Sequence, residues 1–166
     1  MLASREARHL RNNPVFQQAI RATVVDEAAM PWITPAPQLN AALVKYLRAD
    51  PARDEIVMLV KAPAGTVLPT LHHSGSAFVY TLQGRWKYRE LDWLASPGSS
   101  VFVPSASRLT VEVLDADILT LSVVVGDLLL IGPDEEVLAV ENWKSAVDRY
   151  QAYCRTALIE PRDLTA

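Results

Sequence analysis

Short apolar segments recur at regular intervals through the middle of the chain, and turn-forming residues separate them. The intervals between segments contain glycine, proline or aspartate. Runs of this length and spacing predict the β-strands of a sandwich or barrel. A chain of 166 residues can bury one substantial core, so the sequence predicts one all-β domain. The predicted strands lie at residues 42–47, 55–62, 77–82, 85–91, 100–103, 110–113, 118–125 and 128–131.

Helices are predicted at both ends of this β region. Asn13 followed by Pro14 is typical of a helix start, which predicts a short helix to about Thr23. Asn142 predicts the start of a second helix that runs to about Ala157 and has apolar side chains on one face. The predicted parts are an N-terminal helical or irregular extension at 1–38, a barrel at 39–140 and a helix packed on the barrel at 141–166.

Composition narrows the classes of partner and compartment. The net charge is −3 and no basic face or polybasic run is present, which argues against nucleic acid. No apolar run is long enough to cross a membrane, and the first 13 residues lack the apolar stretch of a secretion signal. A single cysteine, Cys154, excludes an internal disulfide. We therefore predict a cytoplasmic protein that binds neither nucleic acid nor membrane.

The stretch from Gly65 to Gly84 has the spacing of the first metal-binding motif of the cupins, G-x5-H-x-H-x3-E-x6-G. Both glycines are in register, and His73 occupies the second histidine position. Leu71 stands at the first histidine position, and Ala77 stands at the glutamate position.

The second cupin motif, G-x5-P-x-G-x2-H-x3-N, is recognisable from Gly98 onward. Its histidine position holds Leu109. The two motifs together predict a cupin double-stranded β-helix, or jelly-roll, barrel in which most metal-ligand positions carry other residues.

The hairpin around Gly84 allows its second strand to be oriented. Trp86, Tyr88 and Glu90 alternate with three basic residues, so the two groups face opposite sides of a strand. Because a row of bases belongs in water, we expect the aromatic face and Glu90 to point into the barrel.

The segment from Tyr80 to Trp93 resembles the L-Q-G-x-W-x-Y-x-E-x-D-W segment of the 2,4'-dihydroxyacetophenone dioxygenase family. The resemblance implies non-haem Fe(II) held by histidines and a glutamate, and O2-dependent cleavage of a carbon–carbon bond in an aromatic hydroxyketone. At the family's ligand positions this chain keeps His73 and Glu90, whereas Leu71 and Leu109 replace two histidines.

Two retained ligands are fewer than the three that an Fe(II) oxygenase needs. His72 is adjacent to His73 and is expected to face the opposite side of its strand. We therefore predict no bound cofactor, a hydrogen bond between His73 and Glu90, and a barrel pocket for a small aromatic or acyl molecule. The residues predicted to line this pocket are Leu71, His73, Tyr80, Trp86, Tyr88, Glu90 and Leu109.

Two other functions fit the same residues. An oxygenase-like enzyme would hold Fe(II) or another divalent transition metal with His73, Glu90 and His72. A purely structural role would make the chain a partner of another cupin chain. A homodimer is predicted in each case, because cupins commonly pair.

Overall fold

The computed structural model describes residues 22–39 and 41–166. The predicted helix from Pro14 lies outside these residues except for its last two positions, which are not helical. Two short 3-10 turns, η1 (Glu27–Ala29) and η2 (Pro37–Leu39), precede the first strand. Between them, Ile33 pairs with Val44 and Ala36 is buried, and Leu39 of η2 is buried as well, so this segment contributes to the core.

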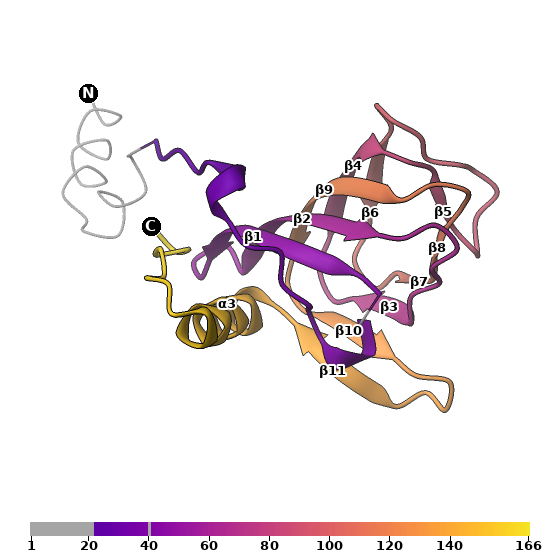
Figure 1. Ribbon diagram of the computed structural model, residues 1–166. Coiled ribbons are helices and arrows are strands. Elements are labelled where there is room, and N and C mark those ends of the chain that lie inside the picture. Colours follow the sequence, from indigo (N-terminus) through magenta and orange to yellow (C-terminus); the bar gives the residue numbers. More distant parts are fainter. Residues whose placement is uncertain (1–21, 40) are drawn as a thin grey trace, which may run out of the picture.

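Antiparallel sheets enclose the interior of the molecule, as Figure 1 shows. The larger sheet has the order β1 (Leu43–Asp50), β2 (Glu55–Ala62), β9 (Ile118–Val125), β4 (Ala77–Gln83), β6 (Ser100–Val103). The second has the order β11 (Val137–Glu141), β10 (Leu128–Ile131), β3 (Thr70–His73), β7 (Arg108–Leu109). A separate antiparallel pair, β5 (Trp86–Tyr88) and β8 (Val111–Val113), forms a two-stranded sheet. The predicted all-β barrel is confirmed.

The predicted strand ranges coincide with β2, β6, β9 and β10. The predicted strand at 85–91 is shorter in the structure, since β5 ends at Tyr88 and the chain turns at Arg89 and Glu90. The strands β3, β7 and β11 were not predicted. β3 and β7 are short and contain histidines or an arginine, so neither forms an apolar run in the sequence.

Strand β9 alternates strictly between buried and half-buried residues, and its polarity is unusual. Thr120 and Ser122 face the interior, whereas Leu121 and Val123 face outward from the larger sheet. A strand with one solvated face ordinarily carries polar residues on that face instead, and the inward row of β9 also includes the apolar Ile118 and Val124. The inner face of β9 therefore presents two hydroxyl groups to the interior, and its outer face presents apolar side chains.

The C-terminal helix α3 (Trp143–Ala157) begins and ends where the sequence predicts. The Asn142 side chain caps it by accepting from the Ser145 N–H, and the Asn142 N–H donates in turn to the Ser145 hydroxyl. Its buried stripe packs on β1 and β2. Ala146, Tyr150 and Cys154 form this stripe.

The division at residues 38/39 and 140/141 stays a prediction. Among the described residues, no helix is both long and apolar enough to span a bilayer.

Candidate functional site

A largely apolar cavity of about 110 Å³ lies inside the barrel. Side chains from both large sheets line it, and Pro35 and Leu39 from the segment before β1 close part of it. The lining residues that carry polar groups are His73, Thr120, Ser122, Tyr46, Tyr88 and Glu141. A mainly apolar lining with a few placed polar groups is the usual composition of a ligand site.

His73 is the retained histidine of the first motif, and the structure places it in this cavity. Its backbone is fixed at the end of β3, where its N–H donates to the Ser107 carbonyl at 2.9 Å and its carbonyl accepts from Ala106 at 2.8 Å. The residue is only 3% exposed, and neither ring nitrogen has a hydrogen-bond partner among the described residues. Burial, and secondarily the nearby His72, lowers the pKa of His73 to about 4. The imidazole is therefore neutral at physiological pH.

The prediction that Glu90 points into the barrel is wrong. Glu90 is exposed and is absent from the lining of the cavity, and its carboxylate accepts from the Thr110 N–H at 2.9 Å. The predicted hydrogen bond between His73 and Glu90 is therefore not formed. The physical reason is the early end of β5, because alternation of faces stops where the chain turns at Arg89.

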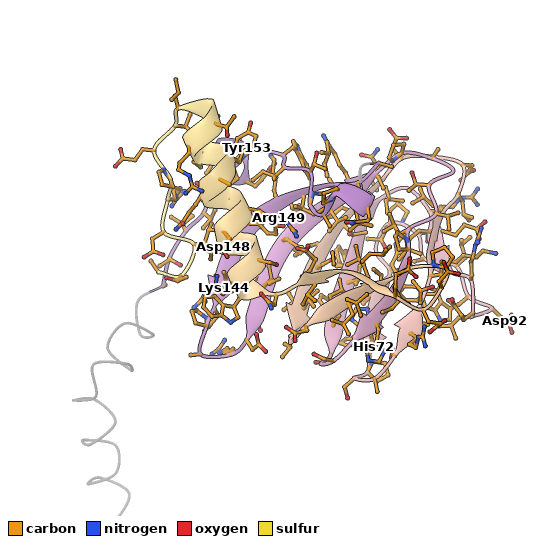
Figure 2. All side chains as sticks on the ribbon, turned by 90° about the horizontal axis from the view of Figure 1, so that it is seen from below. His72, Asp92, Lys144, Asp148, Arg149 and Tyr153 are labelled. Carbon is orange, nitrogen blue, oxygen red and sulfur yellow. The ribbon has the colours of Figure 1, made fainter. Side chains whose placement is uncertain are left out.

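His72 lies on the opposite side of β3 from His73, as strand geometry predicts. It pairs in register with Arg108 and Leu129, and Figure 2 shows it at the periphery of the molecule. The residues proposed for a metal, His73, His72 and Glu90, thus point to different places. Within residues 22–39 and 41–166, no three His, Cys, Asp or Glu side chains converge as metal ligands would. The described residues do not fit the iron centre that the cupin resemblance implies.

The aromatic face of β5 does point inward. Trp86 and Tyr88 are 2% and 3% exposed, and both line the cavity. The Trp86 Nε1–H donates to the Thr81 hydroxyl at 2.9 Å, which satisfies the indole in the core. The rings of Trp86 and Tyr88 meet edge to face with centroids 5.1 Å apart, and Trp93 packs against both. These contacts fix the wall of the cavity.

Of three further residues predicted to line the pocket, one lines the cavity in the structure and two do not. Leu71 lines the cavity beside His73's strand position, as predicted. Tyr80 is a correction: it lies on the outer face of β4 and does not line the cavity, because Val79 takes the inward position. Leu109 is also a correction, since it pairs with Leu71 and packs against the core but lines a separate hollow rather than this cavity.

Sequence reasoning missed the polar groups on the other cavity walls. Tyr46, on β1, is 1% exposed, and its hydroxyl has no hydrogen-bond partner of good geometry in the described part of the chain. Glu141, the last residue of β11, is buried and paired with Arg149 of α3. The sequence signal that could have indicated Glu141 is its place at the end of an apolar run, directly before the helix cap Asn142. The inward hydroxyls of Thr120 and Ser122 lie 3.5 Å apart.

Comparison with known proteins agrees with this fold. A family model described as the ChrR cupin-like domain matches residues 21–127. No curated protein matches the sequence.

Several solved structures are similar over most of the chain. An RmlC-like cupin protein from Ralstonia eutropha has 40% sequence identity and a TM-score of 0.85, covering 90% of this chain and 98% of its own. A second protein of that organism, described as having a cupin-like fold and unknown function, has 19% identity, a TM-score of 0.77, and coverages of 89% and 93%. An acetylacetone dioxygenase from Acinetobacter johnsonii has 16% identity, a TM-score of 0.67, and coverages of 80% and 91%.

The two more distant likenesses show the fold alone. The predicted cupin barrel is confirmed, and the finer resemblance to 2,4'-dihydroxyacetophenone dioxygenases stays a prediction.

Proposed function

Because the chain belongs to the ChrR cupin-like domain family, we propose that its barrel holds a small, uncharged organic molecule, aromatic or acyl, in place of a metal ion. One observation carries this proposal. His73 has both ring nitrogens buried and unpaired among the described residues, at the wall of a cavity whose surface is otherwise mainly carbon.

The energetic argument concerns the two nitrogens of His73. A buried polar atom left without a partner costs about 1–3 kcal/mol, so such atoms in native proteins ordinarily have a water or ligand partner. The neutral imidazole offers one N–H donor and one acceptor, which suit a hydroxyl or carbonyl group. The carbon walls favour an apolar body and disfavour a charged guest. These features support an uncharged ligand with one polar group near His73.

Calorimetric titration with phenol tests the proposal. We expect phenol to bind the untagged protein and to bind His73→Phe about tenfold more weakly, the value of one hydrogen bond. Leu71→Ile is the matched control, because it changes the shape of the cavity wall and keeps His73.

Metal analysis of the same untagged protein separates this function from the oxygenase alternative. We expect well under one transition-metal atom per chain. A stoichiometric iron, nickel or zinc ion that His73→Ala removes would overturn the proposal and favour a metalloenzyme.

We also propose that the protein pairs with a second copy through the outer face of the larger sheet. Phe78 and Phe102 lie there as a directly paired cross-strand couple, with ring centroids 5.1 Å apart and Phe102 76% exposed. Leu121 and Val123 of β9 extend the same apolar face. A two-fold contact would place this patch, which we call the Phe102 patch, against itself.

A further inference from the structure

We propose that the cavity has a second polar end, formed by Tyr46 and Glu141, and that its ligand is therefore a single-ring molecule with polar groups at opposite ends of the ring. This inference rests on the proposed function, since it assumes that the cavity binds an organic ligand. It adds a recognition element that lies outside the cupin metal-motif positions.

The register of the second sheet sets the separation of the two ends. His73, Leu128 and Glu141 lie directly across from one another on β3, β10 and β11. Neighbouring strands are about 4.8 Å apart, so the backbones at His73 and Glu141 are roughly 10 Å apart. All three side chains are buried and line the cavity. The row therefore presents an imidazole, an apolar surface and a carboxylate in that order.

Tyr46 faces the carboxylate end from the larger sheet. Burial, and then the charge of Glu141, raises the pKa of the Tyr46 phenol, so it stays protonated and can donate. Its hydroxyl lies near Glu141 and Arg149 but makes no hydrogen bond of good geometry to any described residue. The Tyr46 hydroxyl is thus a buried donor directed at the end of the cavity opposite His73.

The negative charge of Glu141 is balanced by its ion pair with Arg149, which makes this end of the cavity suitable for an uncharged group. Arg149 pairs with one of its oxygens, and the Ser145 hydroxyl donates to the other at 3.3 Å. Figure 2 shows Arg149 on the side of α3 that faces the strands. Each carboxylate oxygen can accept more than one hydrogen bond. A ligand hydroxyl here can donate to Glu141 and accept from Tyr46.

The size of the cavity limits the body of the ligand. A volume of about 110 Å³ is somewhat below the roughly 150 Å³ of an apolar cavity known to take benzene. The cavity is therefore of the order of size of one six-membered ring. Polar groups in para positions would address both ends, whereas groups in meta positions would leave one end without a partner.

Titration calorimetry under argon with phenol, 1,4-dihydroxybenzene and 1,3-dihydroxybenzene tests this inference. We expect the wild-type protein to bind the 1,4 isomer about tenfold more tightly than phenol or the 1,3 isomer, the net gain of placing its second hydroxyl against Tyr46 and Glu141. In Tyr46→Phe the advantage of the 1,4 isomer over phenol should fall about threefold, because the acceptor Glu141 remains. Tyr150→Phe is the matched control: it removes the hydroxyl of a buried tyrosine outside the cavity, which accepts from the Arg162 N–H, and should keep the advantage.

The outcomes distinguish this inference from the proposed function. Tight binding of phenol with equal affinities for the two isomers, or an unchanged preference in Tyr46→Phe, would overturn the second polar end alone. Failure of all three probes to bind the wild-type protein would overturn the proposed function with it. The isomer comparison needs no variant, so misfolding of Tyr46→Phe would not prevent a decision.

Discussion

Burial of a single imidazole determines which protonation state the cavity presents. His73 is surrounded mainly by carbon, and its charged form loses water without gaining a nearby carboxylate partner, because Glu90 lies at the surface. This desolvation explains why the pKa of His73 falls rather than rises. His73, at a histidine position of the first cupin motif, thus presents a neutral imidazole within an apolar wall.

The lowered pKa of His73 predicts a specific loss of stability in acid. Between about pH 6.5 and pH 4 the unfolded chain binds a proton at this residue and the folded chain does not, so the free energy of unfolding falls as the pH falls. The full shift corresponds to roughly 3 kcal/mol. Urea unfolding at pH 7.5 and pH 4.5 should show a larger loss for the wild type than for His73→Phe. Equal losses in the two proteins would show that His73 does not remain neutral in the folded state.

Among the elements, β5 shows how far a sequence pattern can be extended. Alternation correctly places Trp86 and Tyr88 inside, because these residues pair with β8. It fails two residues later at Glu90, where the chain turns and the ladder ends. The ends of strands depend on tertiary pairing, which period-two patterns do not encode. The sequence predicted β9 and α3 fully, because their patterns are local. It missed Tyr46 and Glu141, because their roles depend on which sheets face each other.

Substitutions on the two faces of β5 should have very different costs. Trp86→Ala removes a buried indole, its hydrogen bond to Thr81 and its edge-to-face contacts, so it should lower the free energy of unfolding by about 3–5 kcal/mol. Lys87→Ala, on the opposite face of the same strand, should change it by less than about 0.5 kcal/mol. Chemical denaturation of both variants measures the difference. Similar small losses would contradict the assigned orientation of β5.

At the scale of the whole molecule, the larger sheet separates two kinds of surface. Its inner face carries the hydroxyls of Thr120 and Ser122 toward the cavity, and its outer face carries the Phe102 patch. The two inner hydroxyls lie within hydrogen-bonding distance of each other, and an exposed aromatic couple is explained by a covering partner. The ligand proposal and the dimer proposal thus concern opposite faces of the larger sheet, so they can be tested independently.

The Phe102 patch predicts that the protein is a dimer and that one charge abolishes the pairing. Phe102→Glu would bury two like charges near each other across a two-fold interface, at a cost that a desolvated carboxylate cannot recover. We expect light scattering after size exclusion to give twice the chain mass for the wild type and a single chain mass for the variant. Val137→Glu is the matched control, because Val137 is also an exposed apolar strand residue but lies on β11 of the other sheet. Since the hydroxyl-lined cavity lies on the far side of the sheet, a correctly folded Phe102→Glu monomer should still bind phenol. A wild-type protein that stays monomeric at high micromolar concentration would contradict the proposed dimer through the Phe102 patch.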